Sequence, residues 1–251
     1  MKNNIIKSAR KADKYLLDLL FPKICQSCGK KGVFLCNECL YQIEIKKIQT
    51  CPVCQKSATE RGKVCRLCNR LTHNFPLHSL LISSDYQDAL IKKLIHQYKY
   101  KFAFELADPL SEILIKAIKK HELIIPDLII PVPLHPFRLR WRGFNQSALL
   151  AEKIGEHLLT NLDIPIDSQI LQRVKNTPSQ ANIKKAAQRR ENIKNAFRVN
   201  TNKENLAKIK NKRVLLVDDV CSSGSTLFEC ASQIQPLQPK SISAIVIARQ
   251  R

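Results

Sequence analysis

Eight of the ten cysteines stand in four C-x-x-C pairs within one short stretch, and no other feature constrains the folding of this chain as strongly. Two residues between the cysteines allow both sulfurs to reach one tetrahedral ion, and two such pairs complete a closed zinc site. The stretch has few aliphatic residues, so bound metal has to supply its cohesion. We predict two structural zinc ions, held by Cys25, Cys28, Cys36, Cys39, Cys51, Cys54, Cys65 and Cys68.

The pairing of these cysteines stays open in the sequence. Joining the first pair with the second and the third with the fourth is the simplest arrangement of a double zinc ribbon, and a crossed arrangement is the alternative. An iron–sulfur cluster and redox-active dithiols are the competing chemistries. Disulfides are disfavoured because we expect a cytoplasmic protein, where thiols stay reduced.

Two observations favour the cytoplasm. The basic start has no apolar run long enough for a signal peptide, and no segment approaches the roughly 18 apolar residues of a membrane span. Between Ile5 and Leu20, apolar residues recur every three to four positions with Lys and Arg between them. This pattern predicts an amphipathic helix that ends near Pro22 and docks on the rest of the protein, with a membrane surface as the alternative.

The formal net charge of +21 points to a polyanionic partner. Residues 1–75 and 134–200 carry much of the excess, which predicts two separate basic regions. The alternative is that the charge serves solubility alone.

From about residue 79, strand-like and helix-like segments alternate. Near-continuous apolar runs occur in "SLLISSDY", "DLIIPVPL", "RVLLVDDV" and "SISAIVIA", with helical periodicity in "YQDALIKKLIHQY", "FELADPLSEILIKAIKK" and "NQSALLAEKIGEHLL" between them. This order predicts an α/β fold with a mainly parallel sheet covered on both faces.

The segment "RVLLVDDVCSSGST" carries the clearest chemistry. Asp218 and Asp219 follow four apolar residues, and ligands of open α/β sheets bind where such strands end. Two carboxylates suit the vicinal hydroxyls of a ribose, and magnesium can bridge to them through hydroxyls or water. The following loop offers backbone N–H groups and hydroxyls to a 5′-phosphate, just before a helix N-terminus. Its residues are Cys221, Ser222, Ser223, Gly224, Ser225 and Thr226.

This segment resembles the 5-phosphoribosyl 1-pyrophosphate (PRPP) motif of type I phosphoribosyltransferases. Together with "PVPLHPFRLRWRGFNQSALLA", "RVKNTPSQ", "RRENIKNAFRV" and the cysteine pairs, it makes the chain similar to the ComF family of competence proteins along almost its whole length. The resemblance implies a type I phosphoribosyltransferase-like fold behind a double zinc ribbon, and a role in natural transformation, where single-stranded DNA is handled. It also implies a pyrophosphate loop at Pro131, Val132, Pro133 and Leu134.

Basic and aromatic residues alternate in "HPFRLRWRGFNQ", a pattern expected of single-strand binding. Trp141 and Phe144 have an equally good interpretation as core residues that pack on the following helix. We expect contacts to DNA or pyrophosphate from Arg138, Arg140, Trp141, Arg142, Lys184, Lys185, Arg189 and Arg190.

We therefore expect an N-terminal helix (1–24), a double zinc ribbon (25–75) and a phosphoribosyltransferase-like domain (76–251). The expected function is the handling of single-stranded DNA during DNA uptake, with PRPP or a related sugar phosphate and magnesium in the acidic site. Partners would be single-stranded DNA and a helicase or other competence protein. The rival is an active phosphoribosyltransferase of nucleotide or salvage metabolism, although no acceptor pocket is readable in the sequence.

Overall fold

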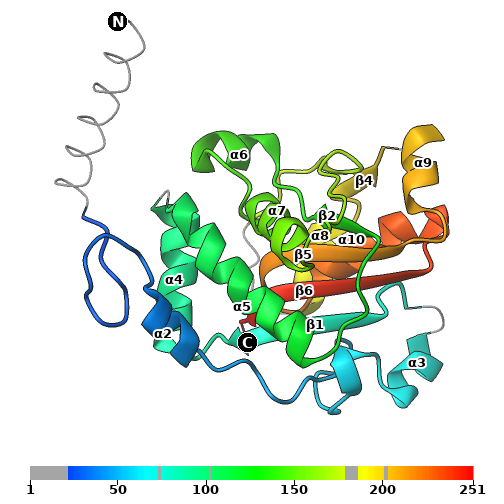
Figure 1. Ribbon diagram of the computed structural model, residues 1–251. Coiled ribbons are helices and arrows are strands. Elements are labelled where there is room, and N and C mark those ends of the chain that lie inside the picture. Colours follow the sequence, from blue (N-terminus) through cyan, green and yellow to red (C-terminus); the bar gives the residue numbers. More distant parts are fainter. Residues whose placement is uncertain (1–21, 73–74, 102, 179–185, 201–202, 251) are drawn as a thin grey trace, which may run out of the picture. The chain divides into compact units, whose positions relative to one another are not determined.

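The computed structural model describes residues 22–72, 75–101, 103–178, 186–200 and 203–250 (Figure 1). The chain divides into two compact units, Met1–Gln42 and Ile43–Arg251. The helix expected before Pro22 lies outside the described residues, and the domain boundary expected at residue 75 stays a prediction.

The first unit contains α2 (Asn37–Gln42). The second unit contains, in chain order, η1 (Glu60–Gly62), α3 (Arg66–Thr72), β1 (Ser79–Asp85), α4 (Ala89–Tyr100), η2 (Phe104–Leu106), α5 (Ala107–Lys120), β2 (Leu128–Pro131), α6 (Pro136–Arg142), α7 (Gln146–His157), β3 (Leu171–Arg173), α8 (Ala186–Ile193), β4 (Phe197–Val199), α9 (Lys203–Ile209), β5 (Arg213–Cys221), α10 (Ser225–Ile234), η4 (Gln235–Leu237) and β6 (Ser241–Arg249).

Four strands of the second unit form a parallel sheet in the order β1-β6-β5-β2. The register places Val217 opposite Pro131 on one side of β5 and opposite Ile245 on the other. In β5, Val214 and Leu216 point into one core cluster while Leu215 and Val217 are buried on the opposite face. Burial on both faces explains the near-continuous apolar runs, because side chains alternate between faces along a strand. The predicted α/β fold with a parallel sheet is confirmed.

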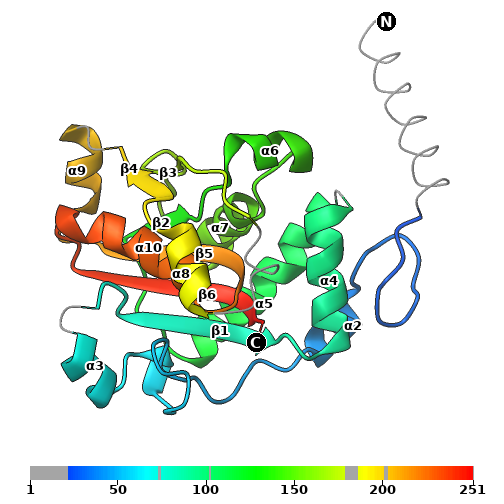
Figure 2. The ribbon, with the colours of Figure 1, turned by 180° about the vertical axis from the view of Figure 1, so that it is seen from behind.

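Helices cover both faces of this sheet. Helices α5 and α7 contact each other and the strands on one face (Figure 1). Helix α10 packs on the other face, with α8 and the small sheet of β3 and β4 beside it (Figure 2). The covered sheet leaves its carboxyl edge as the place where loops converge.

The sequence predicted no strand in the polar stretch from residue 172 to 211. The structure has two short antiparallel strands there, β3 and β4, of which β3 begins one residue earlier. Strands β3 and β4 are three residues each, too short to show an alternating pattern. Their buried residues Leu171, Phe197 and Val199 join the core cluster of the main sheet.

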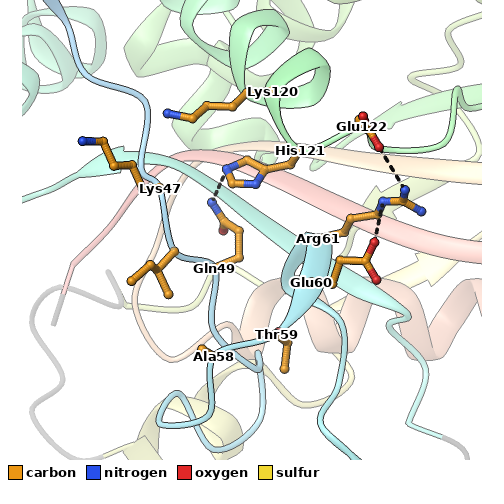
Figure 3. A pocket seen from close by; sticks show the side chains of 10 residues that line it. Lys47, Gln49, Ala58, Thr59, Glu60, Arg61, Lys120, His121 and Glu122 are labelled. Carbon is orange, nitrogen blue, oxygen red and sulfur yellow. Dashed lines mark hydrogen bonds and ion pairs between the residues drawn. The ribbon is translucent and has the colours of Figure 1, made fainter.

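Strand β1 lies at the edge of the sheet, and the segment before it covers that edge. The Lys46 N–H donates to the Ser83 carbonyl at 2.8 Å. The buried amide of Gln49 bonds both the N–H and the carbonyl of Ile82, each at 3.0 Å. Gln49 and His121 also line a cavity of about 490 Å³ (Figure 3). These polar groups satisfy an otherwise open strand edge, so we assign this cavity a structural role.

Candidate functional site

Asp218 and Asp219 lie on β5 beyond the end of β2, where β6 still pairs with the strand. Asp219 is buried and Asp218 is half-buried. Both line a cavity of about 320 Å³ at the carboxyl edge of the sheet. The acids therefore belong to the last part of the strand, which continues to Cys221, rather than to the loop after it.

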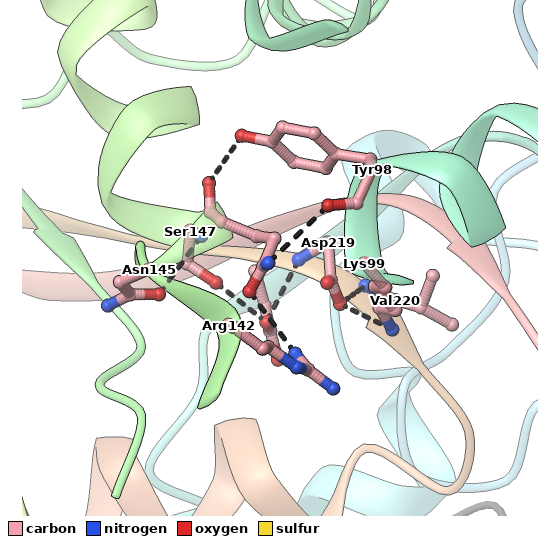
Figure 4. Close-up of polar contacts among 9 residues, drawn as sticks. Tyr98, Lys99, Arg142, Asn145, Ser147, Asp219 and Val220 are labelled. Carbon is pink, nitrogen blue, oxygen red and sulfur yellow. Dashed lines mark hydrogen bonds and ion pairs between the residues drawn. The ribbon is translucent and has the colours of Figure 1, made fainter. Parts of the chain in front are cut away.

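Each carboxylate is held by a specific set of donors (Figure 4). Asp218 Oδ1 accepts hydrogen bonds from Ser147 Oγ and the Asp219 N–H, both at 2.9 Å. Asp219 Oδ1 accepts from the Val220 N–H at 2.6 Å and forms an ion pair with Lys99 Nζ at 2.9 Å. Ser147 and Lys99 come from α7 and α4, so two helices fix the acids in place.

The pKa of Asp218 is strongly shifted. Burial, followed by the negative charge of Asp219, raises the pKa of Asp218 from its ordinary 3.8 to about 7. Burial by itself would lower the pKa of Lys99. The negative charge of Asp219 and its hydrogen bond to Lys99 outweigh that effect, so the pKa of Lys99 is raised. Near neutral pH the site thus holds Lys99 paired with Asp219 beside Asp218, whose pKa lies in the same pH range.

The RGFNQ segment ties the elements around the cavity together. Gly143 ends α6 in the left-handed region, with φ of 75°. Asn145 caps α7 by accepting from the Ser147 N–H, while its amide donates to the Val132 carbonyl at 3.2 Å. Tyr98 Oη donates to the Gln146 carbonyl at 2.9 Å. These contacts use the polar groups of Asn145 and Gln146 to join α4, α7 and the loop after β2.

Three arginines add positive charge to the cavity: Arg138, Arg142 and Arg173. Arg138 donates to the Thr177 carbonyl, and Arg173 Nη2 donates to Thr177 Oγ1 at 2.7 Å. Burial lowers the pKa of Arg173 to about 10, which leaves it charged at neutral pH. The Nε atoms of Arg142 and Arg173 are buried and find no hydrogen-bond partner among the described residues. The positive charge of the three arginines suits an anionic ligand in the cavity.

The glycine-bearing loop after β5 presents its hydroxyls in two directions. Ser222 and Thr226 line the acid cavity, whereas Ser223 and Ser225 line a separate cavity and lie 2.7 Å apart at their Oγ atoms. Gly224 caps α10 with φ of 84°, and a Cβ there would meet the Phe228 ring at 2.7 Å. The structure thus brings two of the six residues of the predicted phosphate loop, Ser222 and Thr226, to the cavity of the acids.

The buried first residue of that loop has a structural partner. Arg249 Nε on β6 donates to Cys221 Sγ at 3.4 Å. Burial raises the pKa of the Cys221 thiol, so this cysteine is not activated as a nucleophile.

The predicted pyrophosphate loop borders the same cavity. Pro131 ends β2 and is buried, while Val132, Pro133 and Leu134 line the cavity. The Val132 N–H donates to the Val217 carbonyl at 2.9 Å, which holds the loop against β5.

Helix α6 presents two faces. Arg138 and Arg142, four residues apart, line the acid cavity. Phe137, Arg140 and Trp141, also three to four residues apart, are exposed, with 58% of Phe137 and 62% of Trp141 accessible to solvent. The predicted core interpretation of Trp141 is therefore wrong. Phe144 is half-buried and packs against Tyr98 of α4, at 5.6 Å between ring centroids, whereas its core interpretation placed it on the following helix.

The remaining basic candidates are placed less fully. Arg189 and Arg190 lie in α8, which contacts α10. Lys184 and Lys185 lie outside the described residues. Their roles stay predictions.

The eight clustered cysteines form two sets of four with the sequential grouping. Cys25, Cys28, Cys36 and Cys39 form one set in the first unit, and Cys51, Cys54, Cys65 and Cys68 form the other in the second unit. The Sγ atoms of each set lie within 4.8 Å of one another.

These distances fit a metal better than disulfides. Measured Sγ–Sγ separations are 3.7 Å for Cys25–Cys36, 3.6 Å for Cys28–Cys36 and 4.0 Å for Cys54–Cys65. Four sulfurs placed tetrahedrally at about 2.3 Å from a zinc ion stand about 3.8 Å apart. Backbone N–H groups of Cys36 and Cys65 also point at thiolates, at 3.4 and 3.3 Å. Both sets therefore fit zinc.

Lys99, Ser147 and Arg173 were missed as site residues by the sequence analysis. Lys99 stands in an ordinary amphipathic helix pattern, and Ser147 follows a helix cap. Arg173 opens the "RVKNTPSQ" string, so that string held the one usable signal.

In the described part of the chain, no helix has the length and apolar character to cross a membrane.

Comparison with known proteins decides the family. The sequence model described as "Phosphoribosyl transferase domain" matches residues 148–251. Competence protein F of Haemophilus influenzae is 32% identical over 219 residues, which cover 86% of this chain and 90% of that protein. The chain belongs to the ComF family. DNA utilization protein YhgH of Escherichia coli K12 is 32% identical over 85% of this chain and 91% of its own length. Competence protein ComFC of Bacillus subtilis is 26% identical over 90% of this chain and 84% of its own length.

Membership of the ComF family confirms the resemblance seen in the sequence, and with it the phosphoribosyltransferase-like fold. In this ComF-family chain the site lies where β2, α4, α6 and α7 meet the end of β5. The family relationship names no ligand for it, so the chemistry has to come from the side chains.

Proposed function

We propose that this chain has a ComF-type role in DNA uptake, in which it handles single-stranded DNA and binds PRPP or a related ribose phosphate. One observation carries the proposal: a single helix, α6, gives two arginines to an acid-lined cavity and an exposed Phe–Arg–Trp face to solvent. The names of the relatives, which refer to competence and DNA utilization, support the biological role.

The cavity supports a ribose phosphate by its donor set. Asp218 and Asp219 would accept from the ribose hydroxyls, and Ser222 and Thr226 would donate to the 5′-phosphate near the start of α10. The Leu134 N–H and the guanidinium groups of Arg142 and Arg173 would receive a diphosphate, since Pro133 has no N–H and the Val132 N–H already donates to the Val217 carbonyl. Magnesium with PRPP stays a prediction, and the carboxylates of the two acids are the ligands that the cavity would offer it.

Phe137, Arg140 and Trp141 support a single strand rather than a duplex. Exposed aromatic faces stack on unpaired bases, and an adjacent arginine contacts the backbone. The net charge of +21 favours a nucleic acid in general, whether single-stranded or duplex. A helicase or other competence protein stays a predicted partner.

The rival function is a phosphoribosyltransferase with PRPP as donor. The carboxylates and cations of the cavity allow it, since positioning and stabilisation of the leaving diphosphate are the main requirements. Filter binding of an oligonucleotide and its duplex across a salt series, beside a pyrophosphate-release assay with PRPP and candidate bases or amines, separates the two. We expect preference for the single strand and no release of pyrophosphate. Release without strand preference would make the transferase the better assignment.

Zinc at the two cysteine sets is proposed as a structural component of both functions. Four thiolates leave no open coordination position, so the metal would hold loops together rather than act on a substrate.

A further inference from the structure

Lys99 occupies an unusual position for a lysine. Its Nζ lies 2.9 Å from Asp219 Oδ1 inside the cavity, with side-chain exposures of 20% for Lys99 and 8% for Asp219. The preceding residue, Tyr98, is fully buried and bonded to the Gln146 carbonyl. The end of α4 is thus anchored to the start of α7, which fixes the point from which Lys99 reaches the acid.

The protein already supplies more positive than negative charge around the acids. Four cationic side chains line the cavity together with the two carboxylates: Lys99, Arg138, Arg142 and Arg173. A divalent ion added beside Asp218 and Asp219 would share the cavity with all four of them, and these like charges oppose its entry.

One oxygen of each carboxylate is also already in use. Both Oδ1 atoms already accept two hydrogen bonds or ion-pair contacts each, from Ser147, the Asp219 N–H, the Val220 N–H and Lys99. Magnesium requires oxygen ligands at about 2.0–2.1 Å in near-octahedral geometry and gives up its own water reluctantly. Because the Lys99 ammonium group already lies 2.9 Å from Asp219 Oδ1, a magnesium ion would have to compete with it for that oxygen.

We propose that Lys99 takes the place of a divalent cation at the acid pair, so that this site binds a ribose phosphate without magnesium. The proposal rests on the ribose-phosphate site proposed above and specifies which cation serves it. An ammonium group has three N–H donors, of which one satisfies Asp219 and the others remain for hydroxyl or phosphate oxygens of the ligand. This assignment disagrees with the magnesium expected from the sequence.

The test measures binding of ribose 5-phosphate by calorimetry, in excess EDTA and in saturating magnesium chloride. We expect the wild-type protein to bind with the same affinity in both. Binding that requires magnesium would overturn the role of Lys99 and leave the ribose-phosphate site standing. Binding in neither condition would overturn the site itself, and the role of Lys99 with it.

Variants assign the effect to the side chain. Lys99→Met should weaken binding in EDTA by about 10- to 100-fold, the loss expected for one charge-assisted hydrogen bond. Magnesium should restore part of that loss, because the freed carboxylate can then ligate it. Lys92→Met is the matched control, since Lys92 is an exposed lysine of the same helix, and it should bind like the wild type.

Lys99→Met leaves the carboxylate of Asp219 buried without its ion pair, which can destabilise the variant, so a second variant is included. Lys99→Arg keeps the charge and should bind in EDTA. If Lys99→Arg folds and binds only with magnesium, a protein-borne charge is insufficient and the proposal fails. The two wild-type measurements decide the question even where both variants are unstable.

Discussion

At the scale of residues, ionising Asp218 costs more free energy in the folded protein than in the unfolded chain. The Asp218 carboxyl is held beside Asp219 and away from water, although Ser147 and the Asp219 N–H favour its ionised form. A carboxyl whose pKa is raised in the folded protein contributes stability that is fully present below its ordinary pKa of 3.8. That contribution is lost as pH rises through about 7.

Asp218→Asn should therefore change how stability depends on pH. Asn keeps the acceptor oxygen for Ser147 but cannot ionise. The difference in unfolding free energy between variant and wild type should grow in favour of the variant by about 1–2 kcal/mol between pH 5 and pH 8, less than the full pKa change implies because Asp218 is half-buried. Urea unfolding of both proteins at the two pH values measures it. Parallel pH profiles would contradict the assignment.

The same acids supply the test of ligand binding. PRPP should raise the melting temperature of the wild-type protein, because a ligand that binds only the folded state stabilises it. Asp218→Asn combined with Asp219→Asn should abolish that rise while the far-UV circular dichroism spectrum stays native. A full response of the double variant would remove the acids from the site.

At the scale of elements, α6 divides three arginines that stand at every second position of the sequence between two faces. Arg138 and Arg142 belong to the cavity, whereas Arg140 stands with Phe137 and Trp141 on the exposed face. The alternation of basic and aromatic residues thus encodes two surfaces rather than one.

Substitutions on the exposed face should affect DNA binding in distinguishable ways. Arg140→Ala should flatten the dependence of log affinity on log salt by about 0.7 for a single strand, because one phosphate contact is lost. Trp141→Ala should lower affinity by about 1–3 kcal/mol without changing that slope. Filter binding across a salt series measures both effects. Arg198→Ala, an exposed arginine on β4, is the matched control. Equal effects of all three would contradict a stacking face on α6.

Much of this element structure could be predicted from the sequence, and the reasons are physical. The apolar runs of β5 and β6 and the helical period of α5 and α7 are local signals, and Asp218 stands out because it follows such a run. Lys99 and Arg173 are site residues only because the fold brings them to the acid cavity, beside residues far along the chain. No local sequence pattern records such contacts. The three-residue strands β3 and β4 are too short for any period to show.

At the scale of the whole molecule, the two cysteine sets belong to different units. The set at Cys25–Cys39 lies in the first unit, while the set at Cys51–Cys68 lies in the unit that contains the sheet. The second set should therefore matter more for the acid cavity than the first.

Metal analysis should find about two zinc ions per chain, from eight thiolates in two closed sets. Replacing Cys25 and Cys28 by Ser should lose one ion and leave the thermal transition of the sheet-containing unit in place. Replacing Cys51 and Cys54 should lose the other ion and lower that transition, because residues 46–49 between the sets cover β1. Iron with a visible chromophore, or no metal, would contradict the zinc assignment.

The strand order has a consequence for synthesis on the ribosome. Strand β6 lies between β1 and β5, yet it is translated after both of them. Until β6 has left the exit tunnel, β1 has no strand neighbour and β5 has only β2. Nascent chains commonly fold as their domains emerge, but this sheet closes only when its inner strand arrives last. The nascent chain therefore exposes the unpaired N–H and C=O groups of its strand edges until β6 emerges. During that period a ribosome-associated chaperone could shield these edges from aggregation.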